Sequence, residues 1–293
     1  KKTALFDYKM FDGLHVLTGS GLGGGSLINA GVIAKPNKEV YEGTHWPKLF
    51  LSDIDDRLEK GFVLAEKMLG GGQYPSGKPG FPPLKKNELL KDSAEKQGTI
   101  FKNLKLSIHF KEPGLNEHKV YQSTCTSCGN CNTGCNYDAK NSLDKNYLAL
   151  AKNNGAEIFT KIYVSHFEKL ANEKYLVFYQ VLEDGKEKIE ESLLQVSLCE
   201  TLIIAAGGIG SPALLQRTQK LTNLMFSPKL GKSFSGNSGL ISCGLNLSLP
   251  VNQVGFEKGI RPNRRTELER RSVSYTHLRA HETKANLVCR LLL

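Results

Sequence analysis

Long apolar stretches are missing from this 293-residue chain, and arginine is scarce in most of it. No run of about 18 apolar residues occurs, which is the length that a membrane-spanning helix needs. No leader pattern of a basic, an apolar and a small-residue region is visible at the start of the chain. We therefore expect a cytoplasmic protein without a transmembrane segment.

Arginine occurs twice before residue 261 and seven times in residues 261–293. Half of the net charge of +10 therefore falls on the last 33 residues. The remaining basic residues form no stripe with interleaved aromatic side chains, which is the pattern expected of nucleic-acid binders. We predict a solvated basic surface and no nucleic-acid partner.

Residues 261–293 also lack an amphipathic period and recognisable turn signals. They are similar to a read-through translation of sequencing-adapter DNA. We predict an aberrant tail that packs poorly. Its apolar residues Tyr275, Leu278 and Leu287 should not share a core with residues 201–215.

Apolar spacing and Gly or Pro breaks predict the order of elements in the rest of the chain. Strands are expected at 14–18, 156–167, 175–182 and after the turn signal Asp184–Gly185, and helices at 51–69, 87–99 and 142–153. Residues 70–83 are rich in Gly and Pro and should form a loop.

Two glycine-rich segments are candidates for binding a phosphate. Gly19, Gly21 and Gly24 match G-x-G-x-x-G, in which the backbone can approach an anion closely. A Gly-rich structural turn stays open as the alternative. Pro36 ends the following segment early, which argues against the long crossover helix of a Rossmann motif. Residues 201–206, TLIIAA, predict a buried strand that leads through Gly207 into a helix at 213–219 capped by Ser211 and Pro212.

Four cysteines are packed into eleven residues, with the spacing C-x2-C-x2-C-x3-C: Cys125, Cys128, Cys131 and Cys135. This is the spacing of a ferredoxin cluster run, although Asn136 stands where proline is usual. A lone run must supply all four ligands, bind a three-iron cluster or borrow Cys199 or Cys243. Zinc, disulfides and metal-free packing stay open as alternatives. The histidines are scattered and suggest no catalytic base.

Three segments, taken in order, resemble glucose–methanol–choline (GMC) oxidoreductases of the cholesterol-oxidase-like branch: GSGLGGGSLINAG, CTSCGNCNTGCNYDAKNSLDKNYLALAKNNGAEI, and TLIIAAGGIGSPALLQR with LGKSFSGNSG. The resemblance covers roughly residues 5–250. It implies an α/β flavoprotein, with a Rossmann-like FAD-binding domain and a substrate domain, truncated at both ends.

The resemblance also implies site residues. The cofactor-binding positions carried over to this chain are Gly19, Gly24, Gly25, Asn29, Ala30, Val32, Val164 and Gly207. Gly24 and Gly25 would touch FAD, and Asn29 would lie near its isoalloxazine ring. Val164 would contact adenine through its backbone, and Gly207 would close on the dinucleotide. We expect residues 19–29 to lie beside the end of strand 201–206.

The family's first nucleotide-binding motif and its catalytic histidine are expected to lie outside this fragment, so its catalytic residues are unknown and it should be inactive alone. We expect part of the FAD domain at 1–50, an insert with the cysteines on the substrate side at 51–154, and a return to the FAD domain at 155–260, as a β-meander, a buried strand and a helix.

The implied reaction is FAD-dependent oxidation of an alcohol, with a sterol-like or other hydrophobic substrate and a possible electron acceptor as partners. A sugar or polyol dehydrogenase of the same family is the nearer alternative. An iron–sulfur electron carrier without flavin is the alternative from another class, and an NAD-binding module is a third.

Overall fold

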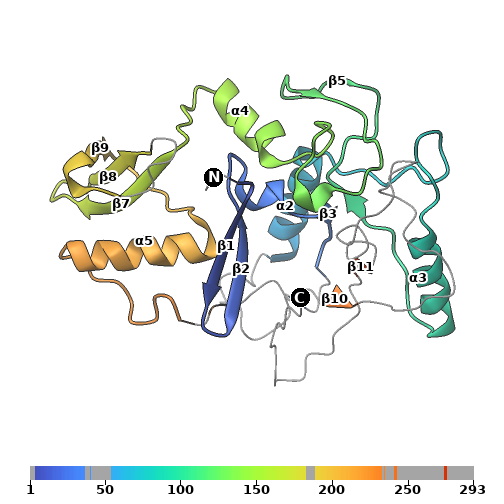
Figure 1. Cartoon of the computed structure of the whole chain (residues 1–293), viewed down its shortest axis with the longest axis horizontal. Helices are drawn as coiled ribbons and strands as arrows, with labels where there is room; N and C mark the ends of the chain where they lie inside the picture. The colour runs from blue at the N-terminus through green and yellow to red at the C-terminus, as the bar shows by residue number, and fades with distance from the viewer. Residues whose placement is uncertain are drawn as a thin grey trace. The chain divides into compact units, whose positions relative to one another are not determined.

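The computed structural model describes residues 4–36, 40, 54–182, 189–232, 234, 241–242 and 274–275. The chain divides into two compact units near residue 157 (Figure 1). Most of the first unit is residues 3–157, and most of the second is residues 158–240. Each unit is described by itself.

The first unit combines short antiparallel strand pairs with helices. Its strands are β1 (Phe6–Phe11), β2 (Leu14–Gly19), β3 (Val32–Ile33), β4 (Lys105–Leu106), β5 (Gly114–Leu115) and β6 (Tyr121–Gln122). Its helices are η1 (Gly24–Leu27), α2 (Ile54–Met68), α3 (Lys85–Lys96), η3 (Cys131–Thr133), η4 (Leu143–Lys145) and α4 (Tyr147–Asn153). The pairs β1–β2, β3–β4 and β5–β6 are antiparallel. The strands β10 (Ile241–Ser242) and β11 (Ser274–Tyr275) pair in the same way.

Polar side chains fill much of the interior of this unit. The buried polar residues there are Ser107, Gln122, Lys140, Ser142 and Asn146. Each has a hydrogen-bond partner, as buried polar groups require. This interior is therefore held by directional bonds as well as by apolar contact.

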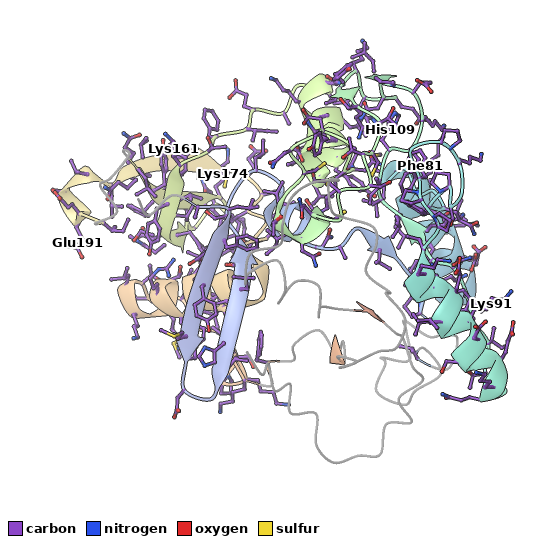
Figure 2. All side chains as sticks on the ribbon, turned by 45° about the vertical axis from the view of Figure 1, so that its right-hand side comes forward. Phe81, Lys91, His109, Lys161, Lys174 and Glu191 are labelled. Atoms are coloured by element: carbon purple, nitrogen blue, oxygen red, sulfur yellow. The ribbon has the colours of Figure 1, made fainter. Side chains whose placement is uncertain are left out.

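An aromatic trio packs beside that polar interior. Tyr74, Phe81 and Phe110 meet edge to face, with ring centroids 5.7–5.8 Å apart. Phe81 is labelled in Figure 2, near His109, whereas Lys91 projects away from α3. Two members of the trio come from the Gly- and Pro-rich loop at 70–83, which is thereby fixed without regular structure of its own.

The second unit is a three-stranded antiparallel meander with one helix. Strands β7 (Ile162–Lys169), β8 (Tyr175–Val181) and β9 (Gln195–Cys199) pair in sequence order, and η5 (Glu191–Leu193) precedes β9. Helix α5 (Gly207–Leu221) contacts β7. Its Leu214 and Thr218 are buried, and the Thr218 hydroxyl accepts a hydrogen bond from the Phe167 backbone.

A β-bulge in β7 is fixed by an arginine of α5. The register of β7 shifts between Val164 and His166. Arg217 donates to the carbonyls of Val164 and Ser165, at 3.2 and 3.1 Å. Because a bulge leaves a residue outside the ladder, the guanidinium stabilises the backbone there. The guanidinium carbon of Arg217 lies 5.2 Å from the centroid of the Tyr163 ring.

Several sequence-based predictions are confirmed. The strand at 14–18, the helices at 51–69 and 87–99, the loop at 70–83 and the β-meander all occur, with bounds that differ by a few residues. The expected helix at 142–153 is divided into η4 and α4, because Asn146 has non-helical dihedrals and its side chain accepts from Tyr147 N. The mixture of helices and strands agrees with an α/β assignment. All the strand pairs that the structure describes are antiparallel.

The prediction of a buried strand at 201–206 is wrong. Residues 201–205 have no regular structure, and Ile203 is 82% exposed. Helix α5 begins at Gly207 instead of residue 213, so Pro212, predicted as a cap, lies inside the helix. The apolar run signalled burial, but no described neighbouring strand pairs with it.

Two predictions fall largely outside the described residues. The turn Asp184–Gly185 is one of them. The other is the tail at 261–293, of which only β11 is described.

The bulge leads to a stability prediction. Arg217→Met should lower the free energy of unfolding by roughly 1–3 kcal/mol, since two carbonyls lose a charged donor. Lys220→Met, on an exposed position of the same helix, should change it by less than about 0.5 kcal/mol. Urea unfolding measures both variants, and equal effects would show that the bulge contacts contribute nothing.

Candidate functional site

The G-x-G-x-x-G segment forms a tight loop between β2 and β3. This loop, residues 19–31, is called here the glycine loop. At Gly19 an added Cβ would lie 2.3 Å from the carbonyl oxygen of Gly24, so only glycine fits there. Gly24 itself has φ +53°, a conformation that glycine adopts without penalty. The glycines are therefore required by the shape of the loop.

The same loop leaves open space at its tip. An added Cβ at Gly24 or Gly25 would meet no atom within 4 Å. Gly25, Asn29 and Val32 are exposed. A ligand can therefore approach the backbone of Gly25 closely, which is the fit expected of a dinucleotide cradle. The predicted positions from Gly19 to Val32 all belong to this one segment, where Ala30 and Gly19 are half-buried.

Three separate contacts anchor the glycine loop to the rest of its unit. The Ser26 hydroxyl donates to Gly23 O and accepts from Leu143 N, at 2.7 and 3.0 Å. Gly31 O accepts from Ser107 N at 2.6 Å. The third contact is the ammonium group of Lys140.

Lys140 is 3% exposed, and its ammonium donates to three backbone carbonyls. These are Leu27 O at 3.1 Å, Asn29 O at 2.6 Å and Cys131 O at 3.0 Å. Three carbonyls match the three N–H donors of an ammonium group. Burial lowers the pKa of Lys140, while the nearby Cys131 and Cys135 thiols and Asp144 oppose that shift.

The four clustered cysteines lie on one loop, called here the cysteine loop (residues 125–135). Its start is held by Cys125 N, which donates to His109 O at 3.0 Å. Ser127 has φ +56°, and its hydroxyl contacts Tyr74 Oη at 3.2 Å and donates to Gly80 O at 3.2 Å. The aromatic trio thus supports the cysteine loop from one side.

All four thiols are free and line one small cavity of about 20 Å³. That volume is close to the space occupied by one water molecule, and far below that of an iron–sulfur cube. Among the described residues, no group of three or more His, Cys, Asp or Glu is arranged to hold a metal ion. The structure therefore does not support the predicted iron–sulfur cluster, although the thiols do face a common space.

Burial has an electrostatic consequence for these thiols. It raises the pKa of Cys131 to about 11, reinforced by Cys125 and opposed by Lys140. Burial raises the pKa of Cys125 as well. A thiol with such a pKa is neutral at pH 7 and a weak nucleophile, since the thiolate is the reactive form.

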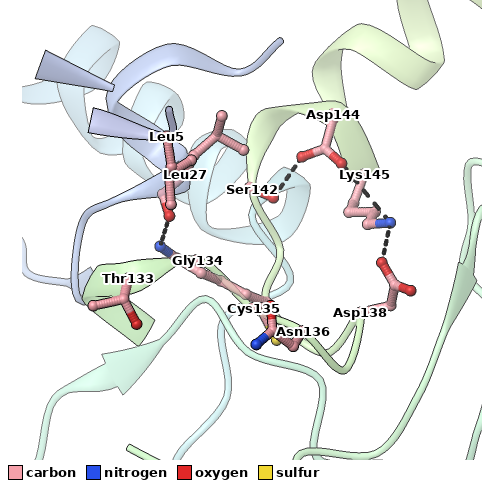
Figure 3. A pocket seen from close by; sticks show the side chains of 11 residues that line it. Leu5, Leu27, Thr133, Gly134, Cys135, Asn136, Asp138, Ser142, Asp144 and Lys145 are labelled. Atoms are coloured by element: carbon pink, nitrogen blue, oxygen red, sulfur yellow. Dashed lines mark hydrogen bonds and ion pairs between the residues drawn. The ribbon is translucent and has the colours of Figure 1, made fainter. Parts of the chain in front are cut away.

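A polar pocket of about 270 Å³ separates the glycine and cysteine loops (Figure 3). Leu5 and Leu27 lie on one side of it, and Asp144, Lys145 and Asp138 form a chain of contacts on the other. Lys145 lies 2.6 Å from Asp138 and 3.8 Å from Asp144. Asp138, Asp144 and Lys145 are thus paired within the pocket, whereas Lys140, which also lines it, donates to backbone carbonyls.

Two predicted cofactor contacts lie in the second unit. Val164 is at the bulge of β7, and its carbonyl already accepts from Arg217. Gly207, with φ +79°, is the first residue of α5. The structure leaves untested whether either residue meets the glycine loop, because the two units are not placed relative to one another.

Sequence reasoning missed Lys140 and Ser26 as anchors. A lone lysine in the polar stretch Asp138–Lys145 has the appearance of a solvated residue. Two of its three partners, Leu27 O and Asn29 O, are backbone atoms more than 100 positions earlier in the chain, and no spacing rule could have identified them.

Comparison with known proteins assigns the family. The family model for GMC oxidoreductases matches residues 12–220, more than half of the chain. The chain belongs to the GMC oxidoreductase family. The resemblance predicted from the glycine and cysteine segments is thereby confirmed.

The curated relatives agree with the family assignment. A cholesterol oxidase of Acinetobacter baumannii is 30% identical over 165 residues, which are 53% of this chain and 29% of that protein. A cholesterol oxidase of Mycobacterium tuberculosis is 27% identical over 274 residues, 87% of this chain and 45% of that protein. The chain therefore spans less than half the length of these relatives. No helix among the described residues is long and apolar enough to cross a bilayer.

The glycine loop leads to a second stability prediction. Gly19→Ala should destabilise the protein by roughly 1–3 kcal/mol, because the new methyl group must displace the Gly24 carbonyl. Gly61→Ala is the matched control, since it lies in α2 with open space around it and should be neutral or stabilising by about 0.5–1 kcal/mol. Thermal unfolding compares them, and a silent Gly19→Ala would contradict this loop geometry.

Proposed function

We propose that this GMC oxidoreductase binds FAD through the glycine loop and oxidises an alcohol. The observation that carries the proposal is the open space at Gly24 and Gly25, next to a backbone that only glycine permits at Gly19. The exposed Asn29 and Val32 extend the same segment. Val164 and Gly207 are proposed as further contacts, to the adenine and to the dinucleotide.

FAD, when bound, supplies the chemistry by accepting a hydride from the alcohol carbon. The role proposed for this chain is to bind and orient the cofactor. The glycine loop supplies a close backbone surface, and its three anchors hold that surface in place.

A hydrophobic, sterol-like alcohol is the substrate class that we propose. The support is the cholesterol oxidase name of the relatives. The GMC family match at residues 12–220 includes both the glycine loop and the cysteine loop. A sugar or polyol is the alternative within the family. The Rossmann-like sheet, the separate substrate domain and an electron acceptor, either oxygen or another partner, belong to the same proposal.

The four cysteines form a second, separate proposal as ligands of one metal centre. Their support is that all four thiols line one cavity, instead of pointing into separate pockets or pairing as disulfides. Because that cavity is about 20 Å³, a cluster would require the loop to open. The flavin proposal does not depend on this centre.

Gly25→Ala tests the flavin proposal. The substitution meets no atom within 4 Å, so it should leave the unfolding midpoint within about 2 °C. It should raise the dissociation constant for FAD by about tenfold or more, because the methyl group occupies the space proposed for the cofactor. Flavin fluorescence quenching measures the affinity.

Gly61→Ala should keep the parent affinity for FAD. Unchanged FAD binding by Gly25→Ala would remove the glycine loop from the cofactor site. The absorption spectrum of the reconstituted full-length protein separates the broader alternatives. Flavin bands are expected, whereas iron without flavin would indicate an electron carrier, and neither would indicate an NAD-binding module.

Metal analysis tests the cysteine proposal. Anaerobically purified full-length protein should contain stoichiometric metal, with labile sulfide if a cluster is present, and Cys128→Ser should lower the metal content. Cys199→Ser distinguishes a four-ligand loop from one that borrows a remote thiol. Substoichiometric metal that Cys128→Ser leaves unchanged would eliminate the centre and leave the flavoenzyme intact.

A further inference from the structure

A buried lysine links the glycine loop and the cysteine loop of the first unit. Lys140 donates to Leu27 O and Asn29 O of the glycine loop and to Cys131 O of the cysteine loop. Both loops lie in the same compact unit, so these contacts are internal to it. No other described side chain hydrogen-bonds to both loops.

The backbone of Lys140 is itself fixed. Lys140 forms an antiparallel bridge with Ile108, while His109 N donates to Ala139 O and Asn141 N donates to Ser107 O. Asn141 is held in turn by Gln122 and by Gly70 O. The lysine therefore extends from a rigid base, and its ammonium position is set by that base.

The energetic cost of burying the Lys140 ammonium indicates the role of this residue. A buried charge is costly unless hydrogen bonds satisfy it, and here carbonyl dipoles do so without a carboxylate hydrogen-bonding to the ammonium. Apolar packing would fill the space more cheaply. What the ammonium adds is direction: it fixes two carbonyls, at Leu27 and Asn29, on either side of Ile28.

Leu27 and Asn29 adjoin the open tip of the glycine loop. Asn29 N also donates to Gly25 O at 3.1 Å, so the segment held by Lys140 connects directly to Gly25. A change in the position of Asn29 O would therefore move the backbone proposed to face the cofactor. A change at Cys131 would reach the glycine loop through the same ammonium.

We propose that Lys140 is a positioning residue that holds the glycine loop in its cofactor-binding shape and couples that shape to the cysteine loop. The coupling to cofactor rests on the proposed FAD function. The holding of the loop does not, because the three hydrogen bonds exist in the chain alone.

Lys145 supplies the matched control. It lies five positions later and lines the same polar pocket, and its side chain is 19% exposed. Its ammonium pairs with Asp138 and Asp144 and, among the described residues, forms no hydrogen bond or ion pair with the glycine loop (Figure 3). Lys145→Met removes the same charge as Lys140→Met and spares the loop carbonyls.

The first arm of the test uses the FAD-free full-length protein. Lys140→Met should accelerate amide hydrogen exchange in residues 24–31 by about tenfold or more, because Leu27 and Asn29 lose their common donor. Lys145→Met should leave exchange in that segment within about twofold of the parent. Equal exchange in parent and Lys140→Met would overturn the proposal, whatever the fate of the FAD assignment.

The second arm measures FAD affinity and the absorption of the bound flavin. Lys140→Met should raise the dissociation constant for FAD by about tenfold, whereas Lys145→Met should keep it within about twofold even at a similar loss of thermal stability. Parent-like affinity in Lys140→Met would overturn the coupling to the cofactor. A parent protein that binds no FAD would instead overturn the proposed function, and the exchange arm would still decide the role of Lys140.

A second variant, which keeps part of the hydrogen-bond donor set, is included in case Lys140→Met does not fold. Lys140→Gln retains two N–H donors and is expected to fold if Lys140→Met does not. It should give intermediate exchange and affinity. Parent-like values for Lys140→Gln, in both arms, would show that the three-carbonyl contact is not needed.

Discussion

The need to satisfy buried polar groups organises the first unit. Ser107, Gln122, Lys140 and Asn146 are all buried. The first three form hydrogen bonds with groups distant in the sequence, and Asn146 donates to Asn141 O. Unpaired, each would cost about 1–3 kcal/mol or more. Their bonds hold loops that have little regular structure. The glycine loop, the cysteine loop and residues 69–70 all depend on this network.

The network explains how an irregular segment can present a defined surface. Loops carry function when a rigid scaffold positions them. Here the scaffold is the set of residues from Ser107 to Leu143, and the glycine loop is fixed to it at Ser26, at Leu27 with Asn29, and at Gly31. Open space beside Gly25 persists because these anchors hold the backbone from the other side.

For the cysteines, the sequence spacing predicts which side chains lie together, whereas the structure shows whether their arrangement suits a metal ion. The spacing predicted that four thiols would converge, and they do line a common cavity. Convergence alone does not make a metal site, because ligand geometry and volume must also fit. The described residues form no such group. Burial keeps Cys131 protonated, with a pKa of about 11, so metal-free packing is a consistent state of the loop.

The second unit is stabilised by a different interaction, between an arginine of α5 and the bulge in β7. In β7, a bulge would leave carbonyls without ladder partners, and Arg217 supplies the donors from α5. The meander was predictable because β-branched and aromatic residues alternate with turn signals in that region. The bulge was not, because it is defined by the partner strand and by Arg217 of α5, which lies 52 positions after Ser165.

The sequence by itself determined the family, the position of the glycine loop and the order of most elements. Those signals are local: glycine spacing, apolar period and turn chemistry act within about ten residues. Gly19 is an example, since the conformation that requires it arises from Gly24, five positions away.

Only the tertiary structure decided which residues hold the loops together. The run at 201–206 has the composition of a buried strand, yet Ile203 is exposed, because burial depends on a neighbouring strand and not on composition. Lysine is a residue type expected at the surface, yet Lys140 is buried, because two carbonyls of the distant glycine loop and that of Cys131 meet at its ammonium. Both outcomes depend on contacts between segments that the chain brings together only when it folds.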